Sequence, residues 1–372
     1  MINDNTNDLK QMLSSYLLSF EKKAKKYIDY EKAFYGTGVT SQLYYSGLKS
    51  ENIQVSAYIN DFINNETFHG KPVYSLEKYK NNFFNKEQSL IFASSLEENT
   101  LNTINLKLKE YKLNYITADE YIFGLHKNEI LEVFDWLSDD LSRITYFSMI
   151  LRRTGLKPDF KSFDYTLSIN DSYLALPEFR QVNEKQTIVD VGAYVGDSIE
   201  AMIWKRQGKF NKIYAFEPDS NNLKALRKRI NRLSEEWGLD KSKFIIEACG
   251  VGEKSDEIKI AKNKTNSSDS SFKIIESNDK DSDMLKIVTI DDYFKDEKIS
   301  ILKADIESME YNMLLGAEKV IKRDKPAISV CIYHNPSDMY RIAHLIKSYN
   351  PDYKLDIRQH YDSLSETVLY CY

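Results

Sequence analysis

The chain contains little cysteine, and what it has shows no metal-binding pattern. Only three cysteines occur in 372 residues, at Cys249, Cys331 and Cys371, and each lies in an apolar, strand-like run. No two of them form a CxxC pair, which is the spacing that commonly marks a zinc site. We therefore expect buried, reduced cysteines in a cytoplasmic protein and no zinc site.

The sequence also lacks long apolar runs and an excess of positive charge. No apolar stretch approaches the roughly 18 residues that are needed to cross a bilayer. The opening MINDNTNDLK carries acids and amides where a secretory signal would have basic residues and then an apolar stretch. The net charge of −5 argues against a general nucleic-acid-binding protein. The basic run at 223–232 has helical spacing and fits a solvated helix face. We expect a cytoplasmic protein with no membrane span and no nucleic-acid partner.

What the sequence does contain is alternating strand-like and helix-like segments, which predict two α/β domains. Residues 1–30 have the apolar spacing of a helix that packs on another element. Alternation over 31–125 predicts a small Rossmann-like domain, and alternation over 186–372 predicts a second one. Residues 126–185 form a mainly helical connector between them. The closing runs YKLDIRQHY and ETVLYCY predict an antiparallel hairpin at the edge of a mostly parallel sheet.

The stretch TIVDVGAYVGDSIEA, residues 187–201, predicts a strand, a glycine turn and a helix. Gly192 allows a positive φ and a close backbone approach, and Gly196 lets the helix begin tightly. In open α/β sheets this first turn lies where ligands bind. Asp197 stands at the helix start, where a carboxylate repels a pyrophosphate. The turn therefore favours a ligand that is not strongly anionic.

Glu217 follows the next predicted strand and precedes Pro218, at the position where an acidic residue accepts hydrogen bonds from ribose hydroxyls. A glycine turn and this acid together favour a nucleoside cofactor over a packing turn with a surface glutamate. S-adenosylmethionine (SAM) fits such a pocket because it carries an adenosine and no phosphate. Asp190 or Asp197 can interact with its cationic part, directly or through water.

Five motifs in order resemble the FkbM family of SAM-dependent methyltransferases. They are VDVGAYVGDS, YAFEPD, ILKADIESMEYNMLLGAEKVI, KPAISVCIYHNPSDMYRIAHLI and RQHYDSLSETVLYCY. The resemblance covers about 187–372 and implies a class I methyltransferase fold that transfers a methyl group, usually to oxygen and often on a sugar or glycan precursor. The family commonly shows Asp-x-Glu-Gly where this chain has Ser308 in place of the glycine. The residues expected to bind the cofactor are Asp190, Gly192, Ala193, Tyr194, Gly196, Asp197, Ser198, Glu217, Pro218 and Ala248.

The acceptor side offers a histidine and two carboxylates. His334 ends a predicted strand, and an imidazole suits a base that takes the proton of an acceptor hydroxyl; a loop-capping histidine is the alternative. Asp305 and Glu307 end another strand and are expected on opposite faces, where they could orient substrate hydroxyls or, less readily, hold a magnesium ion. We take His334 and Asp305 as candidate catalytic residues and Glu307 as a substrate contact.

Arg358, His360 and Tyr361 near the final hairpin are further candidates for substrate binding. Arg358 could grip the phosphate of a nucleotide-linked or phosphorylated sugar, or it could pair with Glu366. Both alternatives remain open from the sequence.

The first domain resembles, more loosely, small α/β domains of some bacterial sugar-modifying enzymes. FYGTGVTSQ places Gly36 and Gly38 after a strand, with Ser41 where a third glycine would complete a dinucleotide fingerprint, and Asp61 lies at the ribose position. A nucleotide or nucleotide-sugar could bind there, and a structural or dimerising role is an equal alternative. The leading hypothesis is a SAM-dependent O-methyltransferase in assembly of a surface glycan. The alternatives are an NAD-dependent oxidoreductase and a non-catalytic nucleotide-sensing module.

Overall fold

The chain divides into two compact units. The computed structural model describes residues 3–62, 66–156, 172–261 and 282–372. Unit 1 comprises Met1–Thr166, Ile332–Arg341 and Asp356–Thr367, and unit 2 comprises Leu167–Cys331, Ile342–Leu355 and Val368–Tyr372. The sequence placed the segments 332–341 and 356–367 in the second domain, but they group with the N-terminal residues. The physical reason is their contacts with N-terminal residues, such as those of Tyr340 with Glu51 and of Arg358 with Asp139.

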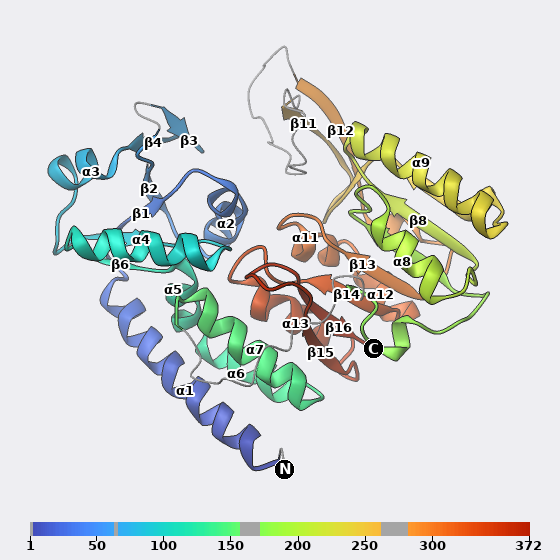
Figure 1. Ribbon diagram of the computed structural model, residues 1–372, viewed down its shortest axis with the longest axis horizontal. Coiled ribbons are helices and arrows are strands. Elements are labelled where there is room, and N and C mark those ends of the chain that lie inside the picture. The colour runs from blue at the N-terminus through green and yellow to red at the C-terminus, as the bar shows by residue number, and fades with distance from the viewer. Residues whose placement is uncertain (1–2, 63–65, 157–171, 262–281) are drawn as a thin grey trace. The chain divides into compact units, whose positions relative to one another are not determined.

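Unit 1 begins with a long helix and continues as an alternation of strands and helices (Figure 1). Its N-terminal elements, in order, are α1 (Asn3–Lys26), β1 (Glu31–Tyr35), α2 (Val39–Ser50), β2 (Val55–Ile59), β3 (Thr67–Phe68), β4 (Lys71–Tyr74), α3 (Leu76–Asn82), β5 (Ser89–Phe92), α4 (Glu98–Glu110), β6 (Tyr115–Ile116), α5 (Ala118–Leu125), α6 (Lys127–Trp136) and α7 (Asp140–Arg153).

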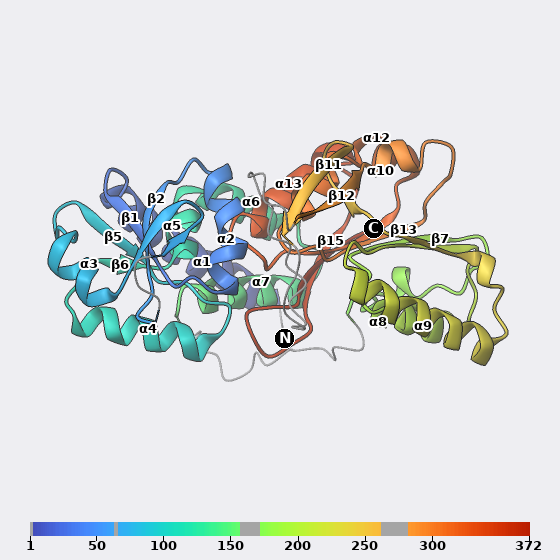
Figure 2. The same cartoon turned by 90° about the horizontal axis from the view of Figure 1, so that it is seen from above.

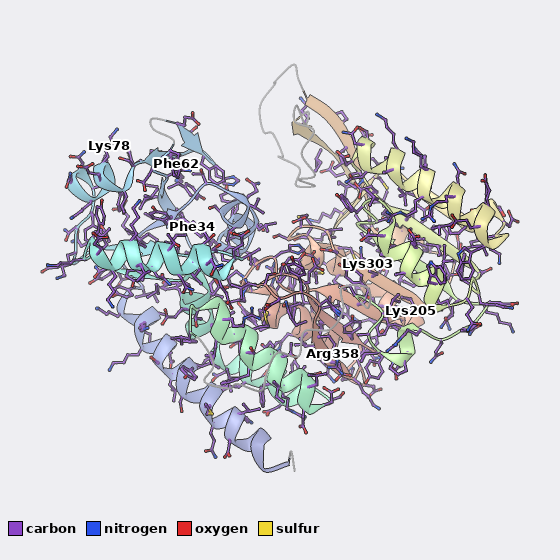
Figure 3. The ribbon with its side chains drawn as sticks, viewed as in Figure 1. Phe34, Phe62, Lys78, Lys205, Lys303 and Arg358 are labelled. Carbon is purple, nitrogen blue, oxygen red and sulfur yellow. The ribbon has the colours of Figure 1, made fainter. Side chains whose placement is uncertain are left out.

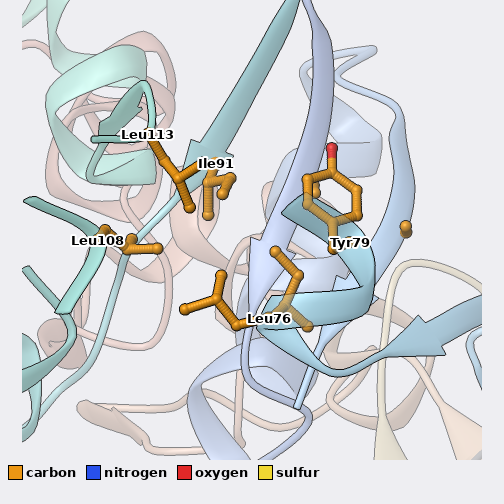
Figure 4. Packing of buried hydrophobic residues seen from close by; sticks show 9 residues of the cluster. Leu76, Tyr79, Ile91, Leu108 and Leu113 are labelled. Atoms are coloured by element: carbon orange, nitrogen blue, oxygen red, sulfur yellow. The ribbon is translucent and has the colours of Figure 1, made fainter. Parts of the chain in front are cut away.

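The sheet of unit 1 has the strand order β3-β4-β2-β1-β5-β6. The pairs β4–β2, β2–β1, β1–β5 and β5–β6 are parallel, and β3 pairs with β4 antiparallel. Every residue of β5 is buried, as expected for a central strand covered on both faces. Ile91 of β5 packs with Leu76 and Tyr79 of α3, Leu108 of α4, and Leu113, which together form part of one core cluster (Figure 4).

Unit 1 also contains a buried charge. Arg153, at the end of α7, has a side chain with 0% exposure, and its Nε lies 2.7 Å from a carboxylate oxygen of Asp119 on α5. The same guanidinium donates to the hydroxyl of Tyr44 and to the carbonyl of Tyr333. Burying a charge is tolerable only when it is paired and hydrogen-bonded. This cluster therefore ties α2, α5 and α7 to the segment 332–341.

Unit 2 contains a second alternation and ends with two strands. Its elements are η2 (Pro177–Phe179), β7 (Thr187–Val191), α8 (Asp197–Lys205), β8 (Lys212–Phe216), α9 (Ser220–Trp237), η3 (Lys241–Lys243), β9 (Phe244–Glu247), β10 (Gly250–Val251), β11 (Asp256–Ala261), β12 (Ser282–Val288), α10 (Ile290–Tyr293), β13 (Ile301–Ala304), α11 (Glu310–Leu315), α12 (Glu318–Asp324) and β14 (Ala327–Cys331), followed by α13 (Asp338–Tyr349), β15 (Leu355–Gln359) and β16 (Thr367–Cys371), which the two units share.

The large sheet has the order β15-β16-β14-β13-β7-β8-β9. Its strands from β14 to β9 run parallel, and β16 pairs antiparallel with β14. Reciprocal backbone hydrogen bonds between Lys354 and Tyr372 are those of an antiparallel pair at the sheet edge. Helices α8 and α9 cover one face of the sheet, and α10 and α12 cover the other (Figure 2). A smaller sheet, β10-β12-β11, follows β9.

These sheets confirm the predicted fold class, α/β with mostly parallel sheets and an antiparallel end. The strand order reverses between β7 and β13, because the chain runs from β7 to β8 and β9 on one side and later to β13 and β14 on the other. Ligands of open α/β sheets bind at such a point, beyond the carboxyl ends of the strands. None of the described helices has the length and apolar character needed to cross a membrane.

Docking of α1 gives a test of the packing in unit 1. A Cβ on Gly124 of α5 would lie 2.5 Å from the backbone carbon and oxygen of Phe20 in α1. We expect Gly124→Ala to cost about 2 kcal/mol of stability in a urea titration, because backbone and not a flexible side chain must move. A Cβ on Gly38 meets nothing within 4 Å, so Gly38→Ala is the control. Equal midpoints for the two variants would contradict this packing.

Candidate active site

The glycine turn between β7 and α8 lies against the end of β13. Gly192 has φ +78°, and a Cβ there would lie 1.9 Å from the carbonyl oxygen of Asp305. Gly196, the N-cap residue of α8, has φ +82°. A Cβ there would lie 2.7 Å from the side chain of Leu226 in α9. Gly192 is therefore required by its close approach to backbone, and both positions favour glycine through their positive φ. The turn stands at the strand-order reversal.

Glu217, just beyond β8, holds the middle of this turn. Its carboxylate accepts hydrogen bonds from the backbone N–H groups of Tyr194 at 2.9 Å and Asp219 at 2.8 Å. Its side chain is only 4% exposed, and burial raises the pKa of this carboxyl, an effect that the surrounding N–H donors only partly offset. The predicted ribose acid is thus fastened to the predicted cofactor turn, with one carboxylate bridging two strand ends.

Asp190 lies below the turn and is fully buried. Its Oδ2 accepts from the hydroxyl of Ser198 at 2.5 Å, and its Oδ1 lies 2.9 Å from Nζ of Lys303 on β13. Lys303 also donates to the carbonyl of Gly192 at 2.7 Å. With 0% exposure, Asp190 supports the turn from below. The exposed Asp197 remains the outward-facing carboxylate of the turn.

Lys303 and Tyr173 were not candidates from the sequence. Lys303 lies within the sheet of unit 2 (Figure 3), and the ring of Tyr173 stands 4.8 Å from its ammonium. Burial lowers the pKa of a lysine, but the charges of Asp190 and Asp305 outweigh this, so the pKa of Lys303 is raised. A lysine inside the apolar run ISILKAD was the available signal for Lys303, since charged residues are rarely buried unless paired. Tyr173 gave no comparable signal.

The turn after β13 carries backbone strain. Glu307 and Ser308 have φ values of +54° and +75°, in the left-handed region that favours glycine. Glu310 is fully buried and accepts a hydrogen bond from the N–H of Ile306 at 2.7 Å. Replacement of the family's glycine by Ser308 therefore leaves a glycine-like conformation in place, at an energetic cost.

This strain can be measured with two variants. Ser308→Gly and Ser308→Ala both remove the hydroxyl, but only glycine adopts φ +75° without a Cβ penalty. We expect the glycine variant to be about 1 kcal/mol more stable than the alanine variant in urea unfolding. Equal stabilities would show that the turn relaxes when the side chain is changed.

His334 and the residues that follow it belong to unit 1. The His334 side chain has 0% exposure, and its ring lies 4.1 Å from that of Tyr333. The next residues pack on α2: a Cβ on Gly47 would lie 2.8 Å from the side-chain oxygen of Asn335, and Glu51 accepts from Tyr340 at 2.7 Å. His334 thus lies in a firmly packed segment, as a base with a fixed orientation would.

Arg358 has a different partner from either alternative suggested by the sequence. Its guanidinium lies 2.5 Å from the carboxylate of Asp139 and donates to the hydroxyl of Ser142 at 2.7 Å, with a side chain only 8% exposed. The predicted pairing with Glu366 is therefore corrected, because Asp139 is the carboxylate that pairs with Arg358. The contact with a substrate phosphate stays a prediction. His360 is buried at 1% exposure, whereas Tyr361 is 55% exposed.

In unit 1, Asp61, the acidic residue at the predicted ribose position, also has protein partners. Gly36 has φ +110°, and Gly38 precedes α2. Asp61 accepts hydrogen bonds from Tyr35, Lys107 and the N–H of Leu76, at 2.9, 2.5 and 2.8 Å. Its carboxylate thus joins β1, α3 and α4, and its use as a ribose ligand stays a prediction.

Comparison with known proteins agrees with the geometry of unit 2. Residues 190–359 match the Methyltransferase FkbM domain. This region belongs to the FkbM methyltransferase family. The whole chain is similar in structure to methyltransferase FkbM from Methylobacillus flagellatus, with 20% sequence identity, a TM-score of 0.57 and coverage of 100% of this chain and 99% of that one. The family predicted from the five motifs is confirmed.

Two further similarities are weaker. An rRNA methylase from Streptococcus thermophilus has 16% identity and a TM-score of 0.32, covering 52% of this chain and 90% of that one. A putative methyltransferase from Streptococcus mutans, solved in complex with SAH, has 12% identity and a TM-score of 0.32, covering 54% and 96%. No curated protein matches the chain. The FkbM match supports a SAM-dependent methyltransferase, and these comparisons give no support for magnesium.

Proposed function

We propose that this FkbM methyltransferase transfers the methyl group of SAM to a hydroxyl of a sugar or glycan precursor, in the cytoplasm. The observation that carries the proposal is the link between Glu217 and the glycine turn at the strand-order reversal of unit 2. A nucleoside cofactor needs an acid for its ribose beside a turn that admits close approach. The acceptor class rests on the family resemblance described above.

The residues of the turn fit SAM better than they fit a dinucleotide. Asp197 is exposed at the start of α8, where a pyrophosphate would be repelled and a cationic ligand is accepted. Glu217 would hold the ribose, with Gly192, Ala193, Tyr194 and the exposed Ala248 around the nucleoside. When bound, SAM supplies an activated methyl group on a sulfonium.

We propose His334 as the base that takes the acceptor proton, and Asp305 as a second residue at the transfer site. Much of the rate of methyl transfer comes from holding the nucleophile in line with the methyl group, so a fixed orientation matters more than basicity alone. The complete burial of His334 supports a fixed imidazole. It also means that the acceptor must reach it in a site shielded from water.

The alternatives are less well supported. An NAD-dependent oxidoreductase or a nucleotide sensor would use the glycine turn of unit 1, but Ser41 stands there in place of the third glycine of a dinucleotide fingerprint. An O-methyltransferase uses the turn of unit 2, where the acid and the glycines are joined.

The cofactor site is tested with Glu217. We expect Glu217→Ala to abolish binding of S-adenosylhomocysteine in calorimetric titration, because the ribose contact and the tie to the Tyr194 N–H are both lost. Glu200 of α8, paired with Arg229 and Arg232, is the control, and Glu200→Ala should bind as the wild type does. Circular dichroism must show both variants folded. Unchanged affinity in Glu217→Ala would refute the ribose assignment.

His334 is tested by separating binding from transfer. We expect His334→Ala to bind S-adenosylhomocysteine within about twofold of the wild type and to transfer label from methyl-labelled SAM to a panel of sugar nucleotides at least about 100-fold more slowly. Equal transfer rates on any acceptor that the wild type methylates would remove His334 as the base.

A further inference from the structure

Tyr173 reaches the end of β13 from outside the FkbM-matched region, which begins at residue 190. Its hydroxyl donates to Oδ2 of Asp305 at 2.6 Å and lies 3.7 Å from the sulfur of Cys331, at the end of β14. Its backbone has φ +65°, a conformation that costs energy for a tyrosine, and its side chain is only 8% exposed. A strained, buried tyrosine that contacts two strand ends is held there by more than hydrophobic packing.

The same tyrosine is part of a charged arrangement beneath the cofactor turn. Its ring covers the ammonium of Lys303, which in turn binds Asp190 of β7 and the carbonyl of Gly192. Lys303 therefore fixes the glycine turn, and Tyr173 fixes the carboxylate of Asp305. The contact between the Tyr173 ring and the Lys303 ammonium joins these two sets of contacts. Asp305 itself is only partly buried, in contrast to Asp190 and Lys303.

The order of the strands gives the direction of the cofactor. With the ribose at Glu217 beyond β8, the rest of the molecule must run over the glycine turn at β7 toward β13, because the order is β13-β7-β8. Two strand spacings amount to about 10 Å, which the methionine part can span. That part carries an ammonium group, and the first carboxylate after β13 is Asp305.

We propose that Asp305 binds the ammonium of the cofactor's methionine part and that Tyr173 is the positioning residue for this contact. The proposal rests on the SAM site proposed above and assigns Asp305 to the cofactor rather than to acceptor hydroxyls. An ammonium-carboxylate contact is a charge-assisted hydrogen bond, and its strength depends on the carboxylate being correctly oriented. The Tyr173 hydroxyl supplies that orientation.

Two probes separate this contact from the rest of the site. S-adenosylhomocysteine carries the methionine ammonium, whereas 5′-methylthioadenosine has the same nucleoside without the amino acid. We expect Tyr173→Phe to weaken the first about fivefold and Asp305→Asn about tenfold or more, with the second changed by less than about twofold. Glu217→Ala should weaken both probes.

The matched control is Tyr353, another buried tyrosine of unit 2. Its hydroxyl donates at 2.7 Å to the carbonyl of Pro326, which precedes β14. Tyr353→Phe thus removes a comparable phenolic hydrogen bond, but at the start of β14, whereas Tyr173 lies near Cys331 at its end. It should leave the affinities for S-adenosylhomocysteine and 5′-methylthioadenosine unchanged. A melting temperature for every variant reports any general loss of structure.

A double variant tests whether Tyr173 acts through Asp305. If it does, Tyr173→Phe/Asp305→Asn binds S-adenosylhomocysteine within about twofold of Asp305→Asn alone, because the tyrosine has nothing left to orient. Additive losses, or equal weakening of both probes by Tyr173→Phe, overturn the proposal while leaving the cofactor site intact. Failure of the folded wild type to bind either probe overturns the cofactor site and this proposal together.

Discussion

The ion pair between Asp190 and Lys303 is the interaction on which the rest of the candidate site depends. Both side chains are removed from water in the middle of a sheet, where a lone charge would be strongly destabilising. Together they are tolerated because Ser198 and the carbonyl of Gly192 complete the hydrogen bonding. The pair thereby joins β7 to β13 at the level of the glycine turn, and Lys303 also fixes the carbonyl of Gly192.

Apolar packing and polar contacts have different roles in the candidate site. The apolar strands bring their carboxyl ends together, but apolar packing has no directional preference that would orient a carboxylate. Orientation comes from polar contacts: Glu217 is set by backbone N–H groups, and Asp305 by the hydroxyl of Tyr173. The contact with Asp305 also accounts for the positive φ of Tyr173, since its surroundings outweigh its local preference.

The parts of this site that could be predicted from the sequence are those whose pattern lies within one short stretch of the chain. Gly192, Gly196 and Glu217 follow strands that the apolar pattern identifies, and the fold places them together. The same pattern predicts the antiparallel end of the large sheet. Long-range contacts were missed, because nothing in a single sequence pairs Lys303 with Asp190, 113 positions apart in the chain, or Tyr173 with Asp305.

Arg358 and Asp61 are residues whose chemistry suits a ligand and which also have protein partners. A guanidinium can bind a phosphate or a carboxylate, and Asp139 of α7 is the nearer anion. Asp61 stands at a ribose position but closes a contact among β1, α3 and α4. In both cases the residue is used to hold together unit 1, whose segments lie far apart in the chain. The type of a charged residue near a strand end therefore does not by itself distinguish a contact with a ligand from a contact that holds the fold together.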